Sequence, residues 1–165
     1  MTTGGKPRPP AGFDHSHEKE EKMVKILFIC HGNICRSVMG QYILQDMVNK
    51  AGLSGNFEID SAAVSREEIG NPIYGPARRE LRKRDVPVGE HRARQVTMED
   101  YRHFDRIYYM DRSNRDYLER LLPRDPEKIR PLLSHDVADP WYTGDFEKTY
   151  TDLTEGCRNI LEDFT

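Results

Sequence analysis

The sequence predicts a doubly wound α/β fold, in which helices cover both faces of a four-stranded parallel sheet. Two observations lead to this prediction. Short apolar segments of strand length alternate with longer segments in which apolar residues recur at helical spacing. The first short segment, residues 24–29, is apolar except at Lys25, and such a nearly continuous run is typical of a strand buried on both faces.

The individual elements follow from the same periodicities. Apolar residues at helical spacing predict a first helix over 38–50, which Gly52 ends, and alternation in 57–61 predicts the second strand. Strand, helix and strand in this order make a right-handed βαβ unit. The remaining expectations are helices at 76–84, 98–104, 111–122 and 146–164, strands at 106–110 and 129–133, and a connection at 86–95.

Length, charge and hydropathy limit the possible classes of protein. A chain of 165 residues fits one domain, which we expect at 23–165, after a disordered extension at 1–22 that is rich in Gly, Pro and charged residues. The net charge of −3 argues against general nucleic-acid binding. No apolar run approaches the ~20 residues of a membrane helix, and the N-terminus lacks the apolar core of a secretory signal. We therefore expect neither a membrane nor a nucleic acid as partner.

The cysteines indicate a reducing compartment. There are three of them, Cys30, Cys35 and Cys157. This number is too small, and odd, for the disulfide framework of a secreted protein. A cytoplasmic location is expected.

The chemistry is concentrated in the stretch from Cys30 to Ser37, which follows the first strand. Five residues separate Cys30 from Arg36. The thiolate is the nucleophilic form of cysteine, and a helix N-terminus and an arginine both stabilise it. The guanidinium can bind two oxygens of a tetrahedral anion, and Ser37 can hydrogen-bond the sulfur. This order of residues predicts a loop that holds an oxyanion, such as phosphate, against a thiolate. The alternative is a buried strand that happens to carry two cysteines.

The residues between the cysteine and the arginine are expected to curl, so that successive N–H groups make a concave anion site. Gly32 permits a positive φ, and Asn33 tolerates the left-handed region better than most residues. The anion-binding loop then comprises His31, Gly32, Asn33, Ile34, Cys35 and Ser37.

A second chemical element is the segment from Asp139 to Tyr142. The departing oxygen of a phosphate monoester needs a proton, and Asp139 is a suitable general acid. Pro140 stiffens the segment, and Tyr142 with Trp141 can wall a pocket and stack on an aromatic substrate. An Asp-Pro pair alone is more often an ordinary turn, so this role depends on the Cys30 loop.

Five motifs together carry a family resemblance. They are the stretch from Cys30 to Ser37, Asp60-Ser-Ala-Ala, His91-Arg-Ala-Arg-Gln, Met110-Asp-Arg-Ser-Asn and Asp139-Pro-Trp-Tyr. Over about 23–164 the chain resembles the low-molecular-weight protein tyrosine phosphatases. The resemblance implies hydrolysis of phosphotyrosine and small aryl phosphates through a phosphocysteine intermediate, without a metal or other cofactor. It makes Cys30 the nucleophile, Arg36 the phosphate ligand and Asp139 the acid.

The resemblance also implies a hydrogen-bonded network that supports the loop. Its members are Asn33, Ser37, Ser61 and His91, and the physical need is clear because a left-handed Asn33 requires a satisfied side chain. Asp111 is a further candidate. No catalytic role is expected for three other histidines: His31, His103 and His135.

Three features depart from the common family pattern. Val38 replaces a frequent proline, Gln41 replaces a frequent glutamate, and Glu67 or Glu68 stands where many members have an aromatic pocket wall. These departures leave the chemistry intact and bear on the choice of substrate.

Three alternatives to phosphotyrosine hydrolysis are compatible with parts of the sequence. Relatives that prefer phosphoarginine resemble this loop but carry threonine at the position of Ile34, and the methyl groups of isoleucine cannot hydrogen-bond a guanidinium. An arsenate reductase coupled to thioredoxin would need a cysteine pair within 92–139, which contains none. A module that only binds phosphate would not need both Cys30 and Asp139.

Cys35 is a candidate redox partner of Cys30. A tightly curled loop can bring the two Cα atoms within the ~7 Å that a disulfide requires, and a resolving thiol protects a reactive thiolate from over-oxidation. The family resemblance implies the same. The alternative is that Cys35 is simply a small buried hydrophobe.

Overall fold

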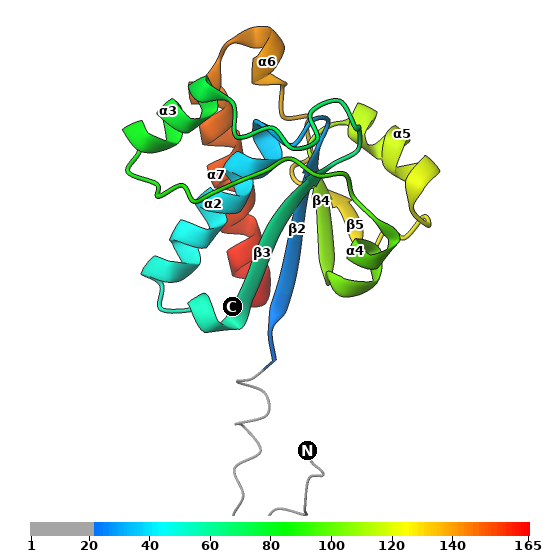
Figure 1. The fold of residues 1–165 in the computed structure, drawn as a ribbon. Helices are drawn as coiled ribbons and strands as arrows, with labels where there is room; N and C mark the ends of the chain where they lie inside the picture. Colours follow the sequence, from blue (N-terminus) through cyan, green and yellow to red (C-terminus); the bar gives the residue numbers. More distant parts are fainter. Residues whose placement is uncertain (1–21) are drawn as a thin grey trace, which may run out of the picture.

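The computed structural model describes residues 22–165, so the predicted extension at 1–22 lies outside the described residues except for Lys22. The fold is built on one parallel sheet with the spatial order β3-β2-β4-β5 (Figure 1). Its strands are β2 (Val24–Cys30), β3 (Phe57–Ala63), β4 (Arg106–Tyr109) and β5 (Ile129–Pro131). The predicted α/β fold with a four-stranded parallel sheet is confirmed.

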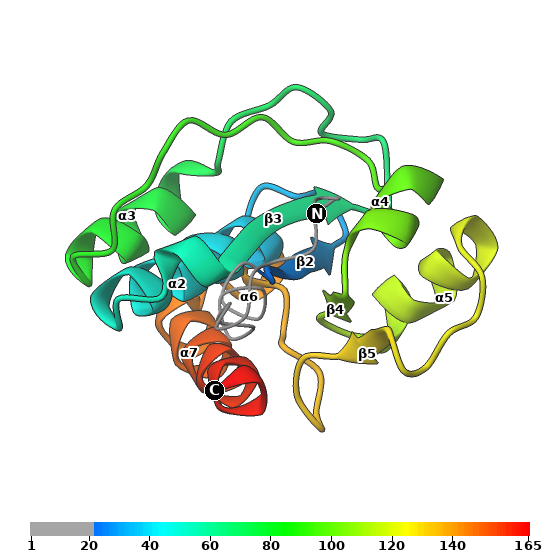
Figure 2. The ribbon, with the colours of Figure 1, turned by 90° about the horizontal axis from the view of Figure 1, so that it is seen from below.

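Helices cover both faces of this sheet. They are α2 (Arg36–Lys50), α3 (Gly75–Lys83), α4 (Met98–His103), α5 (Arg112–Leu121), α6 (Pro140–Thr143) and α7 (Phe146–Phe164), with a short 3-10 helix η1 (Ser54–Asn56). Helices α2 and α7 lie against one face, and α4 and α5 lie against the other (Figure 2). Helix α3 packs beside α2 and α7.

Two apolar layers result, one on each face of the sheet. In β2, Ile26 and Phe28 belong to the layer that includes α2 and α7, whereas Leu27 and Ile29 belong to the layer that includes α5. All four side chains are fully buried. This explains why the strand is apolar at successive positions rather than at alternate ones.

The order of the strands creates a crevice beyond the end of β2. The chain leaves β2 through α2 to reach β3 on one side, and β4 later pairs on the other side. At such a switch point the connections diverge, and ligands of α/β sheets bind beyond the carboxyl ends of the strands. The loop 31–35 follows β2 at this end, and α6 lies at the same end (Figure 1).

Several predicted boundaries differ from the observed ones by one or two residues. Helix α2 begins at Arg36 rather than at 38, because the loop turns directly into it. Strand β5 ends at Pro131 rather than at 133, since proline has no N–H to continue the ladder. Within the connection 86–95, Gln95 makes an isolated bridge to Ala63.

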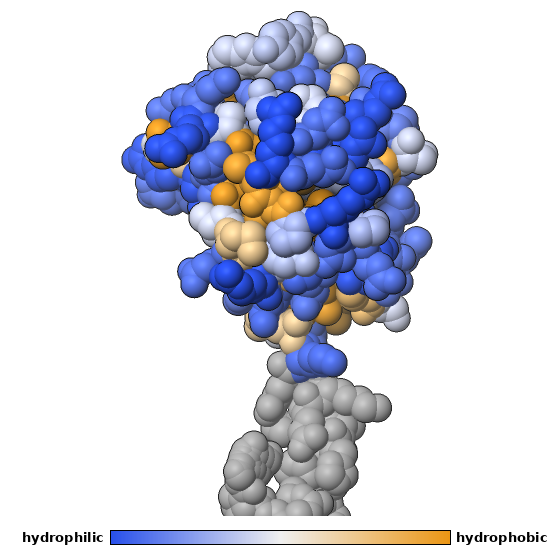
Figure 3. Space-filling view, turned by 90° about the vertical axis from the view of Figure 1, so that its right-hand side faces the viewer, coloured by the Kyte–Doolittle hydropathy of each residue, from blue (hydrophilic) through white to orange (hydrophobic). Residues whose placement is uncertain are grey.

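The flank that carries α5 is mostly hydrophilic, with one apolar patch near the middle of the view (Figure 3). On α5, Tyr117 and Leu121 are partly exposed. None of the helices described for residues 22–165 combines the length and the apolar character that crossing a bilayer requires.

Candidate active site

The loop after β2 forms the floor of a pocket at the carboxyl end of the sheet. The pocket has a volume of about 140 Å³. Its walls come from this loop, from the segment after β3 and from the region of α6: Cys30, His31, Gly32, Ile34, Cys35, Arg36, Glu67, Glu68, Asp139, Trp141 and Tyr142. The fold thus brings together the predicted nucleophile, the predicted phosphate ligand and the predicted acid.

Cys30 lies at the base of the pocket with 3% of its surface exposed. Its Sγ is hydrogen-bonded to Ser37 Oγ at 3.0 Å, and the Asn33 N–H donates to the sulfur at 3.3 Å. The first turn of α2 begins six residues after Cys30, and the free N–H groups of a helix N-terminus stabilise an anion. These surroundings suit a thiolate nucleophile.

The loop backbone is shaped for an anion. The carbonyl oxygens of His31 and Ile34 accept hydrogen bonds from the N–H groups of Ser65 and Tyr74, at 3.1 and 2.9 Å. These carbonyls therefore point away from the pocket. The inner side of the curl is left to N–H groups, which is how a backbone anion site is built.

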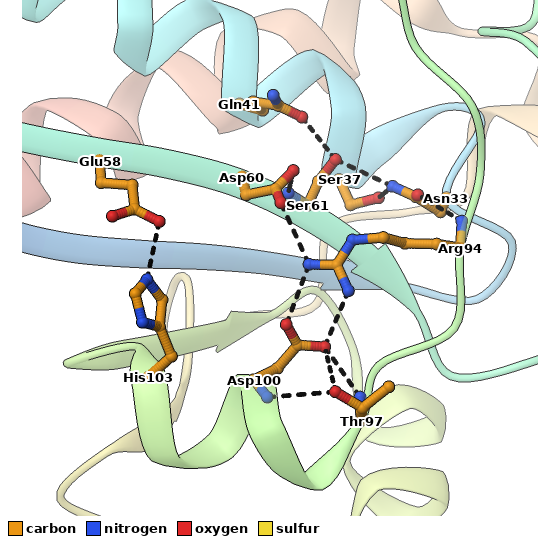
Figure 4. Close-up of polar contacts among 10 residues, drawn as sticks. All are labelled: Asn33, Ser37, Gln41, Glu58, Asp60, Ser61, Arg94, Thr97, Asp100 and His103. Carbon is orange, nitrogen blue, oxygen red and sulfur yellow. Dashed lines mark hydrogen bonds and ion pairs between the residues drawn. The ribbon is translucent and has the colours of Figure 1, made fainter.

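Asn33 holds the loop in its curled shape (Figure 4). Its φ is 64°, as the sequence predicts, and its side chain is fully buried. The amide Nδ2 donates to Ser37 Oγ at 2.8 Å and to Ser61 Oγ at 3.0 Å. Its Oδ1 accepts the Arg94 N–H at 3.1 Å. Both amide protons are therefore used, and the left-handed residue is satisfied on every side.

The same network sets the direction of the Ser37 hydroxyl. The Cys30 thiol donates to Ser37 Oγ, which also accepts from Asn33; when Cys30 is a thiolate, the Ser37 proton is available for the sulfur. Ser61 Oγ also accepts from Asn33, and it donates to Gln41 Oε1 at 2.6 Å. Gln41 thus completes the chain of hydrogen bonds that ends at the predicted nucleophile.

Gly32 does not use the positive φ that glycine permits. It is not among the positive-φ glycines of the described chain. The loop reaches its curl through Asn33 instead. The side chain of Glu68 packs against Gly32, where an added Cβ would lie 3.1 Å from Glu68 Cγ.

Arg36 presents a free donor in this pocket. Its Nη1 donates to Asp111 Oδ2 at 2.7 Å and to the Val137 carbonyl at 2.8 Å, and its Nη2 lies 3.3 Å from Asp139 Oδ2. Burial alone would lower the pKa of Arg36, but the negative charges of Cys30, Asp139 and Asp111 raise it. Its Nε is buried and has no partner within residues 22–165. A buried donor without an acceptor costs free energy, so this edge of the guanidinium is suited to a bound anion.

Asp139 caps helix α6 and faces the arginine. Its Oδ1 accepts the Trp141 N–H at 3.0 Å, and its Oδ2 lies near Arg36. The carboxyl group is 24% exposed. The cap holds one oxygen, and the other stays beside the position where an anion bound to Arg36 would lie. This arrangement suits proton transfer to a departing oxygen.

The upper walls of the pocket combine apolar and acidic side chains. Ile34 is 8% exposed, whereas Trp141 and Tyr142 are 49% and 83% exposed. The carboxylates of Glu67 and Glu68 line the same pocket. An entering group therefore meets aromatic and aliphatic surface together with negative charge.

Comparisons with known proteins identify the family of this chain. Residues 25–165 match the family model of the low molecular weight phosphotyrosine protein phosphatases. The chain belongs to this family. The low molecular weight protein-tyrosine-phosphatase YfkJ of Bacillus subtilis is 36% identical over 147 residues, which cover 84% of this chain and 94% of that one. The crystal structure of YfkJ matches with a TM-score of 0.83 and 35% identity over 86% of this chain and 94% of that one.

Two further relatives show the range of the match. The human low molecular weight phosphotyrosine protein phosphatase is 36% identical over 154 residues, which cover 87% of this chain and 97% of the human one. The crystal structure of a Drosophila arginine phosphatase has a TM-score of 0.78 and 29% identity, over 86% of this chain and 98% of that one.

His91 also supports the loop of this member of the phosphatase family. His91 Nε2 lies 2.7 Å from the Asn33 carbonyl. Burial lowers the pKa of His91 below its ordinary value of 6.5, although the Asn33 carbonyl acts in the opposite direction. The ring is therefore neutral at pH 7, and Nε2 carries the proton because a carbonyl can only accept.

Arg94 ties the phosphatase loop to its neighbours (Figure 4). Its guanidinium donates to both oxygens of Asp100 at 2.8 and 3.1 Å and to Asp60 Oδ2 at 3.1 Å. Asp100 also closes a capping box with Thr97 at the start of α4. Asp60 in β3 and Asp100 in α4 therefore fix the position of Arg94, whose backbone N–H donates to Asn33.

Cys35 is buried next to the predicted nucleophile. Burial, together with the charges of Cys30 and Asp139, raises the pKa of the Cys35 thiol. It is therefore a neutral thiol at pH 7. Cys30 and Cys35 are both unpaired here, and the exchange of a disulfide between them stays a prediction.

The remaining histidines make peripheral contacts. His31 Nε2 lies 3.2 Å from Glu67, and its ring meets Tyr117 edge-on. About half of each of the other two side chains is exposed: His103 bonds Glu58 at 2.7 Å, and His135 lies 3.7 Å from Asp152. In the part of the chain that the structure describes, no group of three or more His, Cys, Asp or Glu residues is arranged to hold a metal ion.

Two contacts of Arg36 were not predicted from the sequence. Asp111 was a candidate for the Asn33 network, but it bonds Arg36 instead. A signal for its placement exists, because Asp111 and Asn114 form a capping box directly after β4. Val137 accepts the hydrogen bond through its backbone carbonyl. A backbone contact of this kind cannot be predicted from the type of residue.

Proposed function

We propose that this chain hydrolyses phosphotyrosine in proteins, and small aryl phosphates, through a phosphocysteine intermediate. The observation that carries the proposal is the unpartnered, buried Nε of Arg36 in a pocket based on Cys30 and edged by Asp139. A guanidinium with a free edge binds phosphate oxygens in a fork. The family match over 25–165 supports the same chemistry.

In the proposed reaction, the thiolate of Cys30 attacks phosphorus in line with the bond to the tyrosine oxygen. The S–P bond forms as the P–O bond breaks, and Asp139 gives its proton to the departing oxygen. Arg36 and the loop N–H groups stabilise the charge on the three equatorial oxygens. Water then attacks the phosphocysteine, Asp139 takes a proton from it, and phosphate leaves. The Ser37 hydroxyl stabilises the thiolate that is released.

The depth of the pocket supports an aryl ester as the substrate. Cys30 at the base is almost completely buried, while Tyr142 at the rim is 83% exposed. A tyrosine ring can span this depth, whereas the shorter phosphoserine would bring its own backbone into the rim. The face of Tyr142 is free to stack on the substrate ring.

Phosphoarginine is the second candidate substrate. One similar structure is that of an arginine phosphatase, and Glu68 lines the pocket here, where a carboxylate could pair with a guanidinium. Ile34 supports the aryl ester instead. Burying an unpaired guanidinium N–H against its methyl groups would cost about 1–3 kcal/mol, which corresponds to a roughly ten- to hundredfold preference in kcat/KM.

The test compares kcat/KM on matched phosphotyrosine and phosphoarginine peptides for the parent and for Ile34→Thr. We expect the parent to prefer phosphotyrosine, and the threonine variant to gain on phosphoarginine relative to it. A parent that prefers phosphoarginine would refute the substrate assignment. Cys30→Ser should retain phosphopeptide binding without turnover; turnover by this variant would refute the phosphocysteine mechanism.

We further infer that residues 23–165 form the phosphatase domain and that it acts in the cytoplasm. The family match over 25–165 and the three unpaired cysteines support these inferences. A chain that starts at Met23 should fold and turn over p-nitrophenyl phosphate at the full rate, and cell fractionation should find the protein in the cytosol.

A further inference from the structure

Tyr74 connects the two halves of the active site without lining the pocket. It precedes helix α3 as its N-cap and is partly buried. Its backbone N–H donates to the carbonyl of Ile34 in the loop at 2.9 Å. Its ring packs on the ring of Trp141 in α6, with centroids 4.8 Å apart and planes inclined at 49°.

We infer that Tyr74 is a positioning residue that holds the general acid in place through Trp141. The inference rests on the proposed function. The Trp141 N–H donates to Asp139 Oδ1 at 3.0 Å, and Asp139 Oδ2 lies 3.3 Å from Arg36 Nη2. A shift of Trp141 therefore moves the N–H that orients the carboxyl group.

Helix α6 needs an anchor of this kind because it cannot support itself. It is four residues long, and Pro140 is its one buried member. A single turn of helix is unstable without tertiary contacts. Gly144 follows with a φ of 73° and ends the turn. The ring contact of Trp141 is thus a main attachment of the segment that carries Asp139.

Tyr74 is itself fixed on the side of the loop. It packs on a small apolar cluster formed by Ile34, Cys35 and Ala93, together with Phe146 at the start of α7. The ring centroids of Tyr74 and Phe146 are 6.1 Å apart. One side chain therefore contacts both the loop that holds the anion and the segment that holds the acid.

The contact also gives the two aromatic residues of the pocket wall different roles. Trp141 is engaged with Tyr74 and half exposed, whereas Tyr142 is 83% exposed and meets no other aromatic ring within residues 22–165. Tyr142 is the residue free to stack on a substrate. Trp141 serves mainly to keep Asp139 in position.

The test depends on how much each substrate needs the acid. Phenyl phosphate has a poor leaving group that must be protonated, whereas p-nitrophenyl phosphate has one that hardly needs a proton. For Tyr74→Ala we expect a roughly three- to tenfold loss of kcat/KM on phenyl phosphate, the size of a lost aromatic pair. The loss on p-nitrophenyl phosphate should be smaller than twofold. Tyr74→Phe should behave as the parent, because no hydrogen bond of the Tyr74 hydroxyl occurs in the described part of the chain.

A spectroscopic readout is available because Trp141 is the only tryptophan of the chain. In Tyr74→Ala its emission should move to longer wavelength, and acrylamide should quench it more strongly, as the ring loses its cover. Tyr74→Phe should leave both properties unchanged. A Trp141 emission that is the same in parent and Tyr74→Ala would overturn the inference.

Tyr150→Ala is the matched control. Tyr150 is also a partly buried tyrosine packed on the main core, but it lies on α7, where its ring contacts Arg84. This variant should leave the ratio of the two kcat/KM values unchanged. A lower ratio in the control, or an equal loss on both substrates in Tyr74→Ala, would overturn the inference. A parent that hydrolyses neither substrate would instead refute the proposed function.

Discussion

Replacing Asn33 separates the two ways in which this residue shapes the phosphate loop. Its side chain makes three hydrogen bonds to Ser37, Ser61 and Arg94, and its backbone adopts a φ of 64°. Asn33→Gly removes the hydrogen bonds but tolerates the left-handed backbone. Asn33→Ala removes the same bonds and also disfavours this backbone.

The expected loss of stability can be worked out bond by bond. The Arg94 N–H is left without an acceptor, which costs about 1–3 kcal/mol, and two buried hydroxyls each lose a donor, at about 0.5–1.5 kcal/mol each. Both variants should therefore lose roughly 2–6 kcal/mol of unfolding free energy, against the total of about 5–15 kcal/mol that is usual for a domain. Alanine in the left-handed region costs about 1–2 kcal/mol more, partly offset by about 0.4–1 kcal/mol from its stiffer unfolded chain. From the mid-values of these two ranges, Asn33→Ala should be the less stable variant by about 0.8 kcal/mol.

Urea unfolding measures these differences, with Asn49→Ala, at an exposed position of the following helix α2, as the control. The control should stay within about 0.5 kcal/mol of the parent. Both Asn33 variants should also lose at least about tenfold in kcat/KM on p-nitrophenyl phosphate, because the Ser37 proton is no longer directed at the sulfur. If both variants unfold within about 1 kcal/mol of the parent, the side-chain network does not hold the loop. If glycine and alanine are equally stable, alanine in the left-handed region costs no more than the about 0.4–1 kcal/mol that the unfolded chain offsets, and the expected strain of about 1–2 kcal/mol is refuted.

Three further changes test other parts of the site. Asp139→Asn should lower kcat/KM much more on phenyl phosphate than on p-nitrophenyl phosphate, and equal losses would remove Asp139 from the acid role. After peroxide treatment and then dithiothreitol, the parent should regain activity while Cys35→Ala should not, because Cys30 would lack a resolving thiol; full recovery of the variant would show that Cys35 only fills space. Since burial lowers the pKa of His91 below 6.5, the unfolded chain takes up a proton that the folded one does not, and stability should fall as the pH drops below about 6.5. Urea unfolding at pH 5.5 and 7.5 should show a smaller difference for His91→Gln than for the parent.

The parts of the site that could be predicted from the sequence are those determined by local order. The run 24–29 identifies a buried strand, and Cys30, Arg36 and the start of α2 follow it so closely that the loop has little freedom. The left-handed Asn33 was predictable because few residue types tolerate that conformation.

Contacts between segments far apart in sequence could be predicted only where the family resemblance implied them, as for Asn33 with Ser61 and His91. The contact of Glu68, from the segment after β3, with Gly32 is one that the sequence does not reveal. Tyr74 carries no sequence signal for its contact with Trp141. The pairing depends on how α3 and α6 approach each other in the folded chain. The spacing of apolar residues along the sequence does not predict this approach.

The bond between Arg36 and the Val137 carbonyl spans 101 positions of the chain, which has a consequence for biosynthesis. While the last third of the chain is still being made, the residues of β2 and of the phosphate loop are already present. In that state Arg36 lacks the carbonyl, and Asp139 has not yet been added. The reactive thiol therefore exists before its acid does, and catalytic competence arrives only with the end of translation.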